Sequence, residues 1–171
     1  RTSYALSKAV GEAVVIAASK EAQVPSTIVR YHNIYGPRMG LSHVIPELIK
    51  RLCSEREVTV YSPTHSRAFC FVNDAVEATI SIVGSKKSVG EVYNVGNPSE
   101  EIQIIDLADK IKNLTDSQSV IFEGEDTIGS PVRRLPDITK IQSETEFRPK
   151  YDLASGLMLT YNWYKPRLEL T

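Results

Sequence analysis

Several features that would direct a functional interpretation are absent from this sequence, or nearly so. No apolar run approaches the roughly 20 residues that a membrane-spanning helix needs. Lysine and arginine number 20 against 21 aspartates and glutamates, so the chain has no basic excess for binding nucleic acid. It has two cysteines and no secretory signal, which argues against a disulfide framework. We therefore expect a cytoplasmic protein that binds neither membrane nor nucleic acid, with Cys53 and Cys70 buried as free thiols.

Metal-binding clusters are also lacking. The three histidines, His32, His43 and His65, share no ligand spacing with cysteines or acids. We therefore expect no metal site.

A glycine-rich turn between a strand and a helix is missing as well. Dinucleotide-binding folds hold a pyrophosphate at such a turn and at the N-terminus of the helix that follows. The nine glycines never cluster in this way, and the chain opens on Arg1 and enters a helix almost at once. We therefore expect a fragment of a longer protein.

The apolar residues that are present alternate between a helical period and a strand period, which is typical of an α/β fold. Residues 4–22 predict an amphipathic helix, and residues 26–31 a buried strand followed by a loop to residue 42. Residues 124–136 predict a surface loop that can close over a ligand. Further helices are predicted over 44–53, 74–83, 106–114, 139–144 and 153–164, and further strands over 58–61, 68–72, 91–95 and 120–123.

Tyr4 and Lys8 lie one turn apart on the same face of the first predicted helix. An ammonium group beside a phenol favours the phenolate, which can take a proton from a hydroxyl. Standing alone the pattern is weak, because eight tyrosines make such a match easy to meet by chance. Tyr161 and Lys165 give a second match, where Pro166 is expected to interrupt the helix.

A second motif follows the first predicted strand: Arg30-x-x-Asn33-x-Tyr35-Gly36-Pro37-Arg38. The amide of Asn33 at a strand's carboxyl end can donate to a phosphate or sugar oxygen, and open parallel sheets bind ligands at such ends. The alternative is an asparagine turn followed by a Gly-Pro stop.

Together these motifs resemble the second half of an extended short-chain dehydrogenase/reductase of the nucleotide-sugar epimerase/dehydratase family. The resemblance continues through residues 60–74, 93–96 and 133–137. It implies an α/β fold: the C-terminal part of an NAD(P)-binding, Rossmann-like protein with its smaller mixed α/β substrate-binding domain. Residues 1–42 would be a remnant of the dinucleotide-binding domain. Residues 43–171 would form the substrate-binding region and return some strands and helices to the Rossmann part.

The resemblance also implies roles for individual residues. Tyr4 would take the proton of a sugar hydroxyl while NAD takes the hydride, and Lys8 would also hold the nicotinamide ribose. NAD is expected in preference to NADP, and the cofactor contacts in this chain would be Tyr4, Lys8 and Tyr31. The nucleotide-sugar contacts would be Asn33, His43, Val44, Tyr61, Arg67, Arg134 and Asp137.

Each of these roles has a plainer alternative. Arg67 could be a surface residue, and Arg133 rivals Arg134 as the arginine that grips the diphosphate. Asp137 could simply cap the helix that begins near residue 139, and Asp74 suits a helix cap better than a ligand. The sequence also departs from the family pattern after Tyr61, where Ser62-Pro63-Thr64-His65 replaces the usual glycines and the span to Arg67 is one residue shorter.

The expected activity is that of an NAD-dependent nucleotide-sugar epimerase or dehydratase, which oxidises C4 of the sugar to a keto intermediate. A decarboxylase of the same family is the alternative. A different class is a non-catalytic nucleotide-sugar-binding remnant or a subunit of a split enzyme, and this chain alone is expected to lack activity. Since relatives commonly dimerise through the helix that carries Tyr4, we expect a homodimer.

Overall fold

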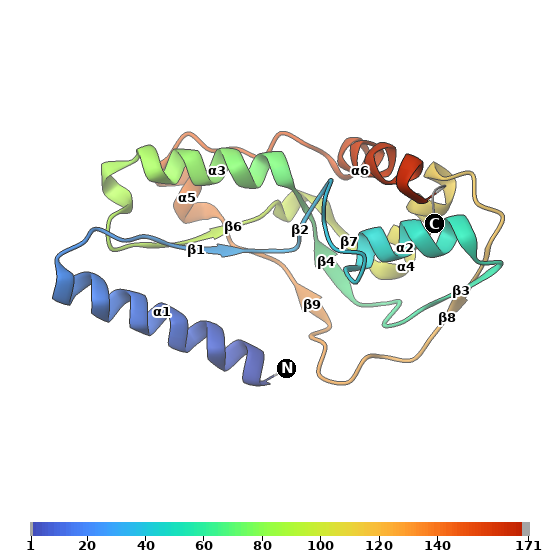
Figure 1. Cartoon of the computed structure of the whole chain (residues 1–171), viewed down its shortest axis with the longest axis horizontal. Helices are drawn as coiled ribbons and strands as arrows, with labels where there is room; N and C mark the ends of the chain where they lie inside the picture. Colours follow the sequence, from blue (N-terminus) through green and yellow to red (C-terminus); the bar gives the residue numbers. More distant parts are fainter. Residues whose placement is uncertain (1, 169–171) are drawn as a thin grey trace.

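The computed structural model describes residues 2–168 as an α/β fold, as the alternation of periods predicts. The helices are α1 (Thr2–Ala22), α2 (Val44–Ser54), α3 (Val72–Gly84), α4 (Ile104–Leu114), α5 (Thr139–Glu144) and α6 (Leu153–Leu168). The strands are β1 (Ile28–Tyr31), β2 (Ile34–Tyr35), β3 (Glu57–Val60), β4 (Ser66–Ala68), β5 (Cys70–Phe71), β6 (Val92–Val95), β7 (Glu101–Gln103), β8 (Val120–Glu123) and β9 (Arg133–Arg134). Figure 1 shows an elongated molecule in which α1 lies apart from the other helices.

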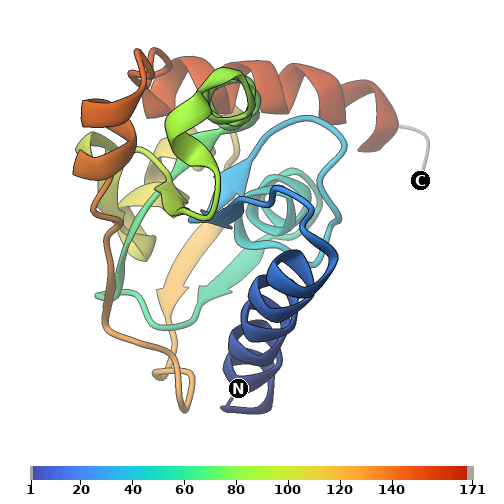
Figure 2. The same cartoon turned by 90° about the vertical axis from the view of Figure 1, so that its left-hand side faces the viewer.

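The strands β1 and β6 form a parallel pair in register along their whole length. α3 and α5 cover one face of this pair, where Tyr93 and Val95 join Ala78 and Ile141 in a small core. α1 lies on the other side of the pair (Figures 1 and 2). Among the described residues β1 pairs with β6 alone, so its other edge carries no strand.

The larger core lies among α2, α4 and α6. β3 pairs in parallel with β8, and its alternation turns Val58 and Val60 inward. β4 lies between an antiparallel β7 and a parallel β9. The apolar residues of the helices recur every three or four positions and so form one stripe on each helix. These stripes are Ile45, Leu48, Ile49 and Leu52 of α2, Leu107, Ala108 and Ile111 of α4, and Leu153, Leu157 and Tyr164 of α6.

Tyr35 of β2 joins the segment after β1 to α6. Its ring packs edge-on against Phe69 and Phe71, and its hydroxyl donates to the carbonyl oxygen of Leu153 over 3.4 Å. Burial raises the pKa of the Tyr35 hydroxyl, which therefore stays protonated and able to donate. A Cβ on Gly156 would collide with that hydroxyl, so glycine is what lets α6 approach this closely.

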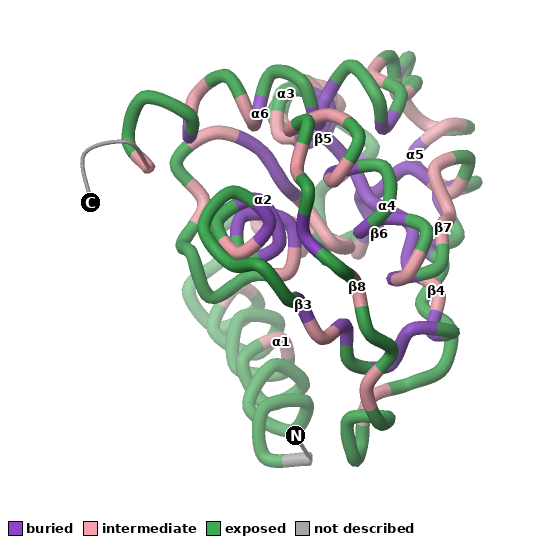
Figure 3. Tube along the Cα trace, turned by 90° about the vertical axis from the view of Figure 1, so that its right-hand side faces the viewer, coloured by how far each residue is buried: buried purple, intermediate pink, exposed green. Residues whose placement is uncertain are grey.

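α1 is exposed almost all round, so the amphipathic helix predicted over residues 4–22 buries neither face. No side chain from residue 3 to residue 22 is buried, and only Glu12 and Ser19 are partly covered (Figure 3). Large apolar side chains such as Leu6 and Val14 are 62% and 60% exposed. The sequence period reveals which residues are apolar, but it does not reveal whether anything covers them.

Short strands account for most of the other differences from the predicted elements. β2 and β9 lie inside predicted loops, and β7 is not predicted at all. The predicted strand over residues 68–72 divides into β4 and β5 at Phe69, and Val72 already begins α3. Every residue from 68 to 71 is buried, so the apolar run gives no sign that the chain changes pairing partner here.

Two single-residue expectations are also wrong. α6 continues through Pro166 to Leu168, because a proline in the last turn removes only one hydrogen bond near the helix end. Cys53 is exposed, since it follows Leu52 around the helix and falls off the buried stripe of α2. Cys70 is buried, as expected.

Candidate functional site

The carboxyl ends of β1 and β6 lie at the same edge of their parallel pair, and three segments meet there. Asn33 follows β1 with a left-handed φ of +43°, and its Nδ2 donates to the carbonyl oxygen of Ala68 over 3.0 Å. Gly96 follows β6, and a Cβ at this position would lie 2.6 Å from Cγ of Pro136. This close approach brings the segment that contains β9 to the edge where open parallel sheets bind ligands.

Arg67 and Arg134 are direct neighbours across the parallel strands β4 and β9 and therefore share one face of the sheet. Arg67 is only 9% exposed. Its Nη1 donates to the carbonyl oxygens of Ser66 (2.6 Å) and Val132 (3.2 Å), and its Nη2 donates to Oγ of Ser130 (2.9 Å). Arg67 is therefore not a surface residue, which was the plainer alternative.

Arg133 turns to the opposite face, where Glu101 of β7 binds it. Its Nε and Nη2 donate to the two carboxylate oxygens of Glu101, each over 2.7 Å. The hydroxyl of Ser66 donates to the same carboxylate over 2.6 Å. Arg133 and Ser66 together hold the pKa of Glu101 at about 2. Of the two adjacent arginines, Arg134 is thus the one beside Arg67.

Tyr4 and Lys8 share a face of α1, with the Lys8 ammonium 5.3 Å from the centre of the Tyr4 ring. Both side chains are exposed. Glu12, one turn further along the same face, receives two hydrogen bonds from the Arg30 guanidinium of β1, over 2.8 and 2.6 Å. Arg30 holds the pKa of Glu12 below its usual range. This ion pair turns the Tyr4 face of α1 toward β1.

The remaining predicted contacts are spread around this region. The hydroxyls of Tyr31 and Thr79 lie 2.7 Å apart, which joins the end of β1 to α3. His43 is exposed and directly precedes α2, whose first residue is the half-buried Val44. Tyr61 follows β3 and is 60% exposed. These residues thus come from separate elements: β1, the start of α2 and the end of β3.

Asp137 and Asp74, each a candidate ligand or helix cap, both accept hydrogen bonds from backbone N–H groups. Oδ1 of Asp137 accepts the Thr139 N–H over 2.9 Å at the start of α5, which matches the capping alternative. Hydrogen bonds from the hydroxyl and the N–H of Thr139 hold the pKa of Asp137 below its usual range. Asp74 is fully buried in the first turn of α3. It does not cap its own helix, because its two oxygens accept the N–H groups of Lys150 and Tyr151 over 3.0 and 3.1 Å.

The turn after β3 is fastened to the loop that leads to β9. Ser62 adopts a left-handed φ of +52°, a conformation that glycine favours. Its N–H donates to the carbonyl oxygen of Glu125, and its Oγ accepts the Thr127 N–H over 2.8 Å. His65 is buried with Nε2 3.5 Å from a carboxylate oxygen of Asp126. The Ser62 side chain thus accepts a hydrogen bond from Thr127 that a glycine at this position could not accept.

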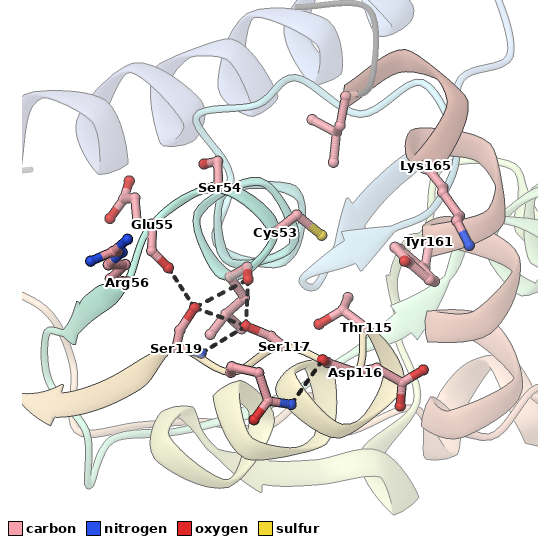
Figure 4. A pocket seen from close by; sticks show the side chains of 13 residues that line it. Cys53, Ser54, Glu55, Arg56, Thr115, Asp116, Ser117, Ser119, Tyr161 and Lys165 are labelled. Carbon is pink, nitrogen blue, oxygen red and sulfur yellow. Dashed lines mark hydrogen bonds between the residues drawn. The ribbon is translucent and has the colours of Figure 1, made fainter.

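Two cavities lie away from the arginines. One of about 640 Å³ lies between the end of α2, the α4–β8 connection and α6 (Figure 4). There the hydroxyls of Ser117 and Ser119 donate to the Leu52 carbonyl oxygen. No predicted site residue lines this cavity. The other, of about 460 Å³, is apolar, lies between β1 and α3, and includes Tyr31.

Residues 2–168 lack two kinds of feature. No helix in this range is both long enough and apolar enough to cross a bilayer. No group of three His, Cys, Asp or Glu side chains in this range could hold a metal ion.

The sequence also matches the model of a known protein family. The model of the NAD dependent epimerase/dehydratase family matches residues 1–96. The chain belongs to this family. The matched segment contains Tyr4, Lys8, Asn33 and Arg67, and the second arginine lies beyond it.

Two similar curated proteins are both named as decarboxylases of a UDP-linked sugar acid. The UDP-N-acetyl-alpha-D-glucosaminuronate decarboxylase of Bacillus cytotoxicus is 35% identical over 96% of this chain and 54% of its own length. UDP-glucuronic acid decarboxylase 3 of Arabidopsis thaliana is 31% identical over 99% of this chain and 50% of its own length. The chain therefore spans about half the length of the curated relatives it matches.

A solved structure of the same kind matches the fold closely. The UDP-glucuronic acid 4-epimerase of Bacillus cereus, in complex with UDP-glucuronic acid and NAD, superimposes with a TM-score of 0.88 at 26% identity. The match covers 96% of this chain and 52% of that one.

Sequence patterns missed three residues that shape the site in this family member. Glu101 and Ser130 contact Arg133 and Arg67 from more than 30 positions away in the chain, and no local period reports such pairs. His65 stood out only as a departure from the family's glycines. A local sign of the Glu101 contact does exist, since the acidic pair at residues 100–101 and the basic pair at 133–134 are complementary in charge.

Proposed function

We propose that the full-length protein is an NAD-dependent enzyme that acts on a UDP-hexuronic acid. The observation that carries this proposal is the pairing of Arg67 with Arg134 at the carboxyl-end edge of the parallel strands. Guanidinium groups bind phosphate oxygens through two parallel N–H donors and remain charged at all physiological pH values. Two of them side by side suit a nucleoside diphosphate.

The sugar is proposed from what the relatives share. Two are named as decarboxylases of a UDP-uronic acid, and the third, a 4-epimerase, was solved with UDP-glucuronic acid. The reactions differ, but each substrate joins UDP to a sugar that carries a carboxylate. Substrate class is therefore better supported than reaction type.

The oxygens around Arg67 indicate how the diphosphate would bind. The Ser130 hydroxyl and the Val132 carbonyl now accept hydrogen bonds from this guanidinium. Both oxygens belong to the exposed segment between β8 and β9, and phosphate oxygens would take the same kind of position on the guanidinium. We infer that this segment shifts when the diphosphate binds, whereas Arg67 stays fixed by its own strand.

Tyr4 and Lys8 are proposed as the acid–base pair. The residues fit a nicotinamide ribose and a sugar hydroxyl, because a phenol and an ammonium lie together on an exposed helix face. NAD, when bound, would supply the hydride acceptor and donor for C4 of the sugar. Tyr4 takes the proton of the C4 hydroxyl, with the Lys8 ammonium beside its ring. Tyr31 is proposed as a further cofactor contact, and NADP is the less favoured cofactor.

Decarboxylation is the favoured outcome. A ketone at C4 stands β to the C6 carboxylate, so CO₂ can leave from C5 while the ketone takes up the electron pair as an enolate. A proton then returns to C5, and the reduced cofactor, held beside Tyr4 and Lys8, would supply the hydride for C4. The decarboxylase names of two relatives favour this outcome, and 4-epimerisation is the alternative that the third relative favours.

Two broader proposals concern the assembly. Residues 1–42 would belong to the dinucleotide-binding domain. Residues 43–171 would form the substrate-binding region and return some strands and helices to the dinucleotide-binding domain.

The apolar residues Leu6, Val10, Ala13 and Ala17 follow one another at helical spacing, away from the face that Glu12 turns toward β1. We propose that this stripe packs on a second copy of the protein, and light scattering that found a monomer would contradict it.

The function is tested with the full-length protein, NAD and UDP-glucuronic acid. We expect loss of CO₂ and a UDP-pentose product by mass spectrometry, and a slowing of roughly 10²–10⁴-fold in Tyr4→Phe because a general acid–base group is removed. Tyr161→Phe is the matched control, since Tyr161 and Lys165 repeat the spacing and are expected to have no effect. Conversion of the sugar without release of CO₂ would indicate epimerisation. Binding of UDP without turnover would favour a non-catalytic module.

A further inference from the structure

The position of β9 depends on side chains as much as on backbone. β9 contains two residues and lies at the edge of the β7–β4–β9 sheet. The exposed segment before it is joined to β4 by the hydrogen bond from the Ser66 N–H to the Val132 carbonyl oxygen, over 2.9 Å. So short a strand forms few ladder bonds, and its register needs a further source of specificity.

That source lies on the face opposite Arg67. Glu101 belongs to β7, Ser66 to β4 and Arg133 to β9, so the carboxylate of Glu101 joins all three strands. Both of its oxygens accept hydrogen bonds from the planar guanidinium of Arg133, an arrangement that fixes direction as well as distance. The carboxylate side chain is 24% exposed, so part of the cluster is shielded from water.

Alternation along a strand converts this contact into a choice between arginines. Successive side chains point to opposite faces, so Arg133 on the Glu101 face puts Arg134 on the Arg67 face. A slip of one residue would exchange the two. Arg134 would then lie on the Glu101 face, and Arg133 would take the position beside Arg67.

We propose that Glu101 is a positioning residue that sets the register of β9 and so selects Arg134, rather than Arg133, to bind the diphosphate with Arg67. The proposal rests on the function proposed above, in which this arginine pair binds a nucleoside diphosphate. Glu101 does not touch the substrate. It acts through Arg133 and the strand that both arginines share.

The first test measures UDP binding to the full-length protein by calorimetry, together with KM and kcat for UDP-glucuronic acid. Glu101→Gln keeps the shape of the side chain but loses its charge and one acceptor. We expect the Kd for UDP and the KM to rise about tenfold with kcat within about twofold, because placement of the phosphate is affected and the acid–base pair is not. A Kd within twofold of wild type would overturn the proposal.

A matched control separates this effect from the general loss of an ion pair. Glu77 and Lys150 form an ion pair of 2.6 Å at α3, away from β9. Glu77→Gln is expected to leave Kd, KM and kcat unchanged. If Glu77→Gln weakened UDP binding as much as Glu101→Gln, the effect would not be one of register, and the proposal would be wrong.

Two double variants complete the test, one of which guards against a Glu101→Gln protein that folds poorly. Exchanging the pair, as Glu101→Arg with Arg133→Glu, rebuilds the contact with reversed polarity and should restore UDP binding to within about threefold of wild type. In an Arg134→Ala background, Glu101→Gln should add less than twofold, because the arginine it positions is gone. Failure of the exchange, or full additivity, would overturn the proposal. A wild-type protein that does not bind UDP would instead contradict the proposed function.

Discussion

The two ends of the candidate chemistry sit in very different surroundings. Arg67 and Arg134 lie on the neighbouring strands β4 and β9, and β4 also pairs with β7, whose Ile102 packs against the core formed by α2, α4 and α6. Tyr4 and Lys8 project from a helix on which no side chain between residues 3 and 22 is buried. The phosphate side of the site is therefore held by contacts within this chain. The proposed acid–base side is joined to β1 by the ion pair between Glu12 and Arg30.

The largest effect should come from within the packed region. Asp74→Ala would leave the N–H groups of Lys150 and Tyr151 buried without an acceptor, at a cost of about 3 kcal/mol in the free energy of unfolding. Urea unfolding measures this. Asp152→Ala is the control, because Asp152 is exposed and accepts from Ser155 alone, so its loss should cost clearly less. Equal losses in the two variants would show that the Asp74 contacts are not buried.

Two helical glycines compare the regions directly. Gly156→Ala places a methyl group against the Tyr35 hydroxyl and should destabilise the chain by about 1–2 kcal/mol after the gain in helix propensity. Gly11→Ala meets no atom within 4 Å and should stabilise α1 by up to about 1 kcal/mol. Thermal and urea unfolding of the chain of 171 residues should therefore give shifts of opposite sign. Shifts of the same sign would contradict the difference in packing.

The smallest expected effect is the change in folding stability at low pH that Glu101 causes. The pKa of Glu101 lies at about 2 in the folded chain, below that of an unfolded glutamate, so this carboxylate stabilises the fold above about pH 4.5. That contribution is lost as the pH falls toward 2, when Glu101 takes a proton. We expect Glu101→Gln to be less stable than wild type at pH 6, and the difference to shrink toward zero between pH 4 and pH 2. A difference that did not change with pH would show that charge is not its cause.

How far the sequence predicts this molecule depends on how local each feature is. The helix that contains Ile45 and Leu52 and the strand that contains Val58 could be predicted, because their periods record a buried face. The spacing of Tyr4 and Lys8 likewise fixes a shared helix face. β2, β7 and β9 could not be predicted, since their strand character comes from partners distant in the chain. For the same reason the sequence favours Arg134 only through the family resemblance and keeps Arg133 as its rival, whereas the register of β9 and the Glu101 contact separate the two in the structure.

The central claim is that the diphosphate side of the site is complete in this chain and the cofactor side is not. Calorimetric titration of the folded chain of 171 residues with UDP and, separately, with NAD tests it most directly. The account predicts that UDP binds, that Arg134→Ala weakens this binding, and that NAD gives no measurable heat. Binding of NAD without binding of UDP would contradict it.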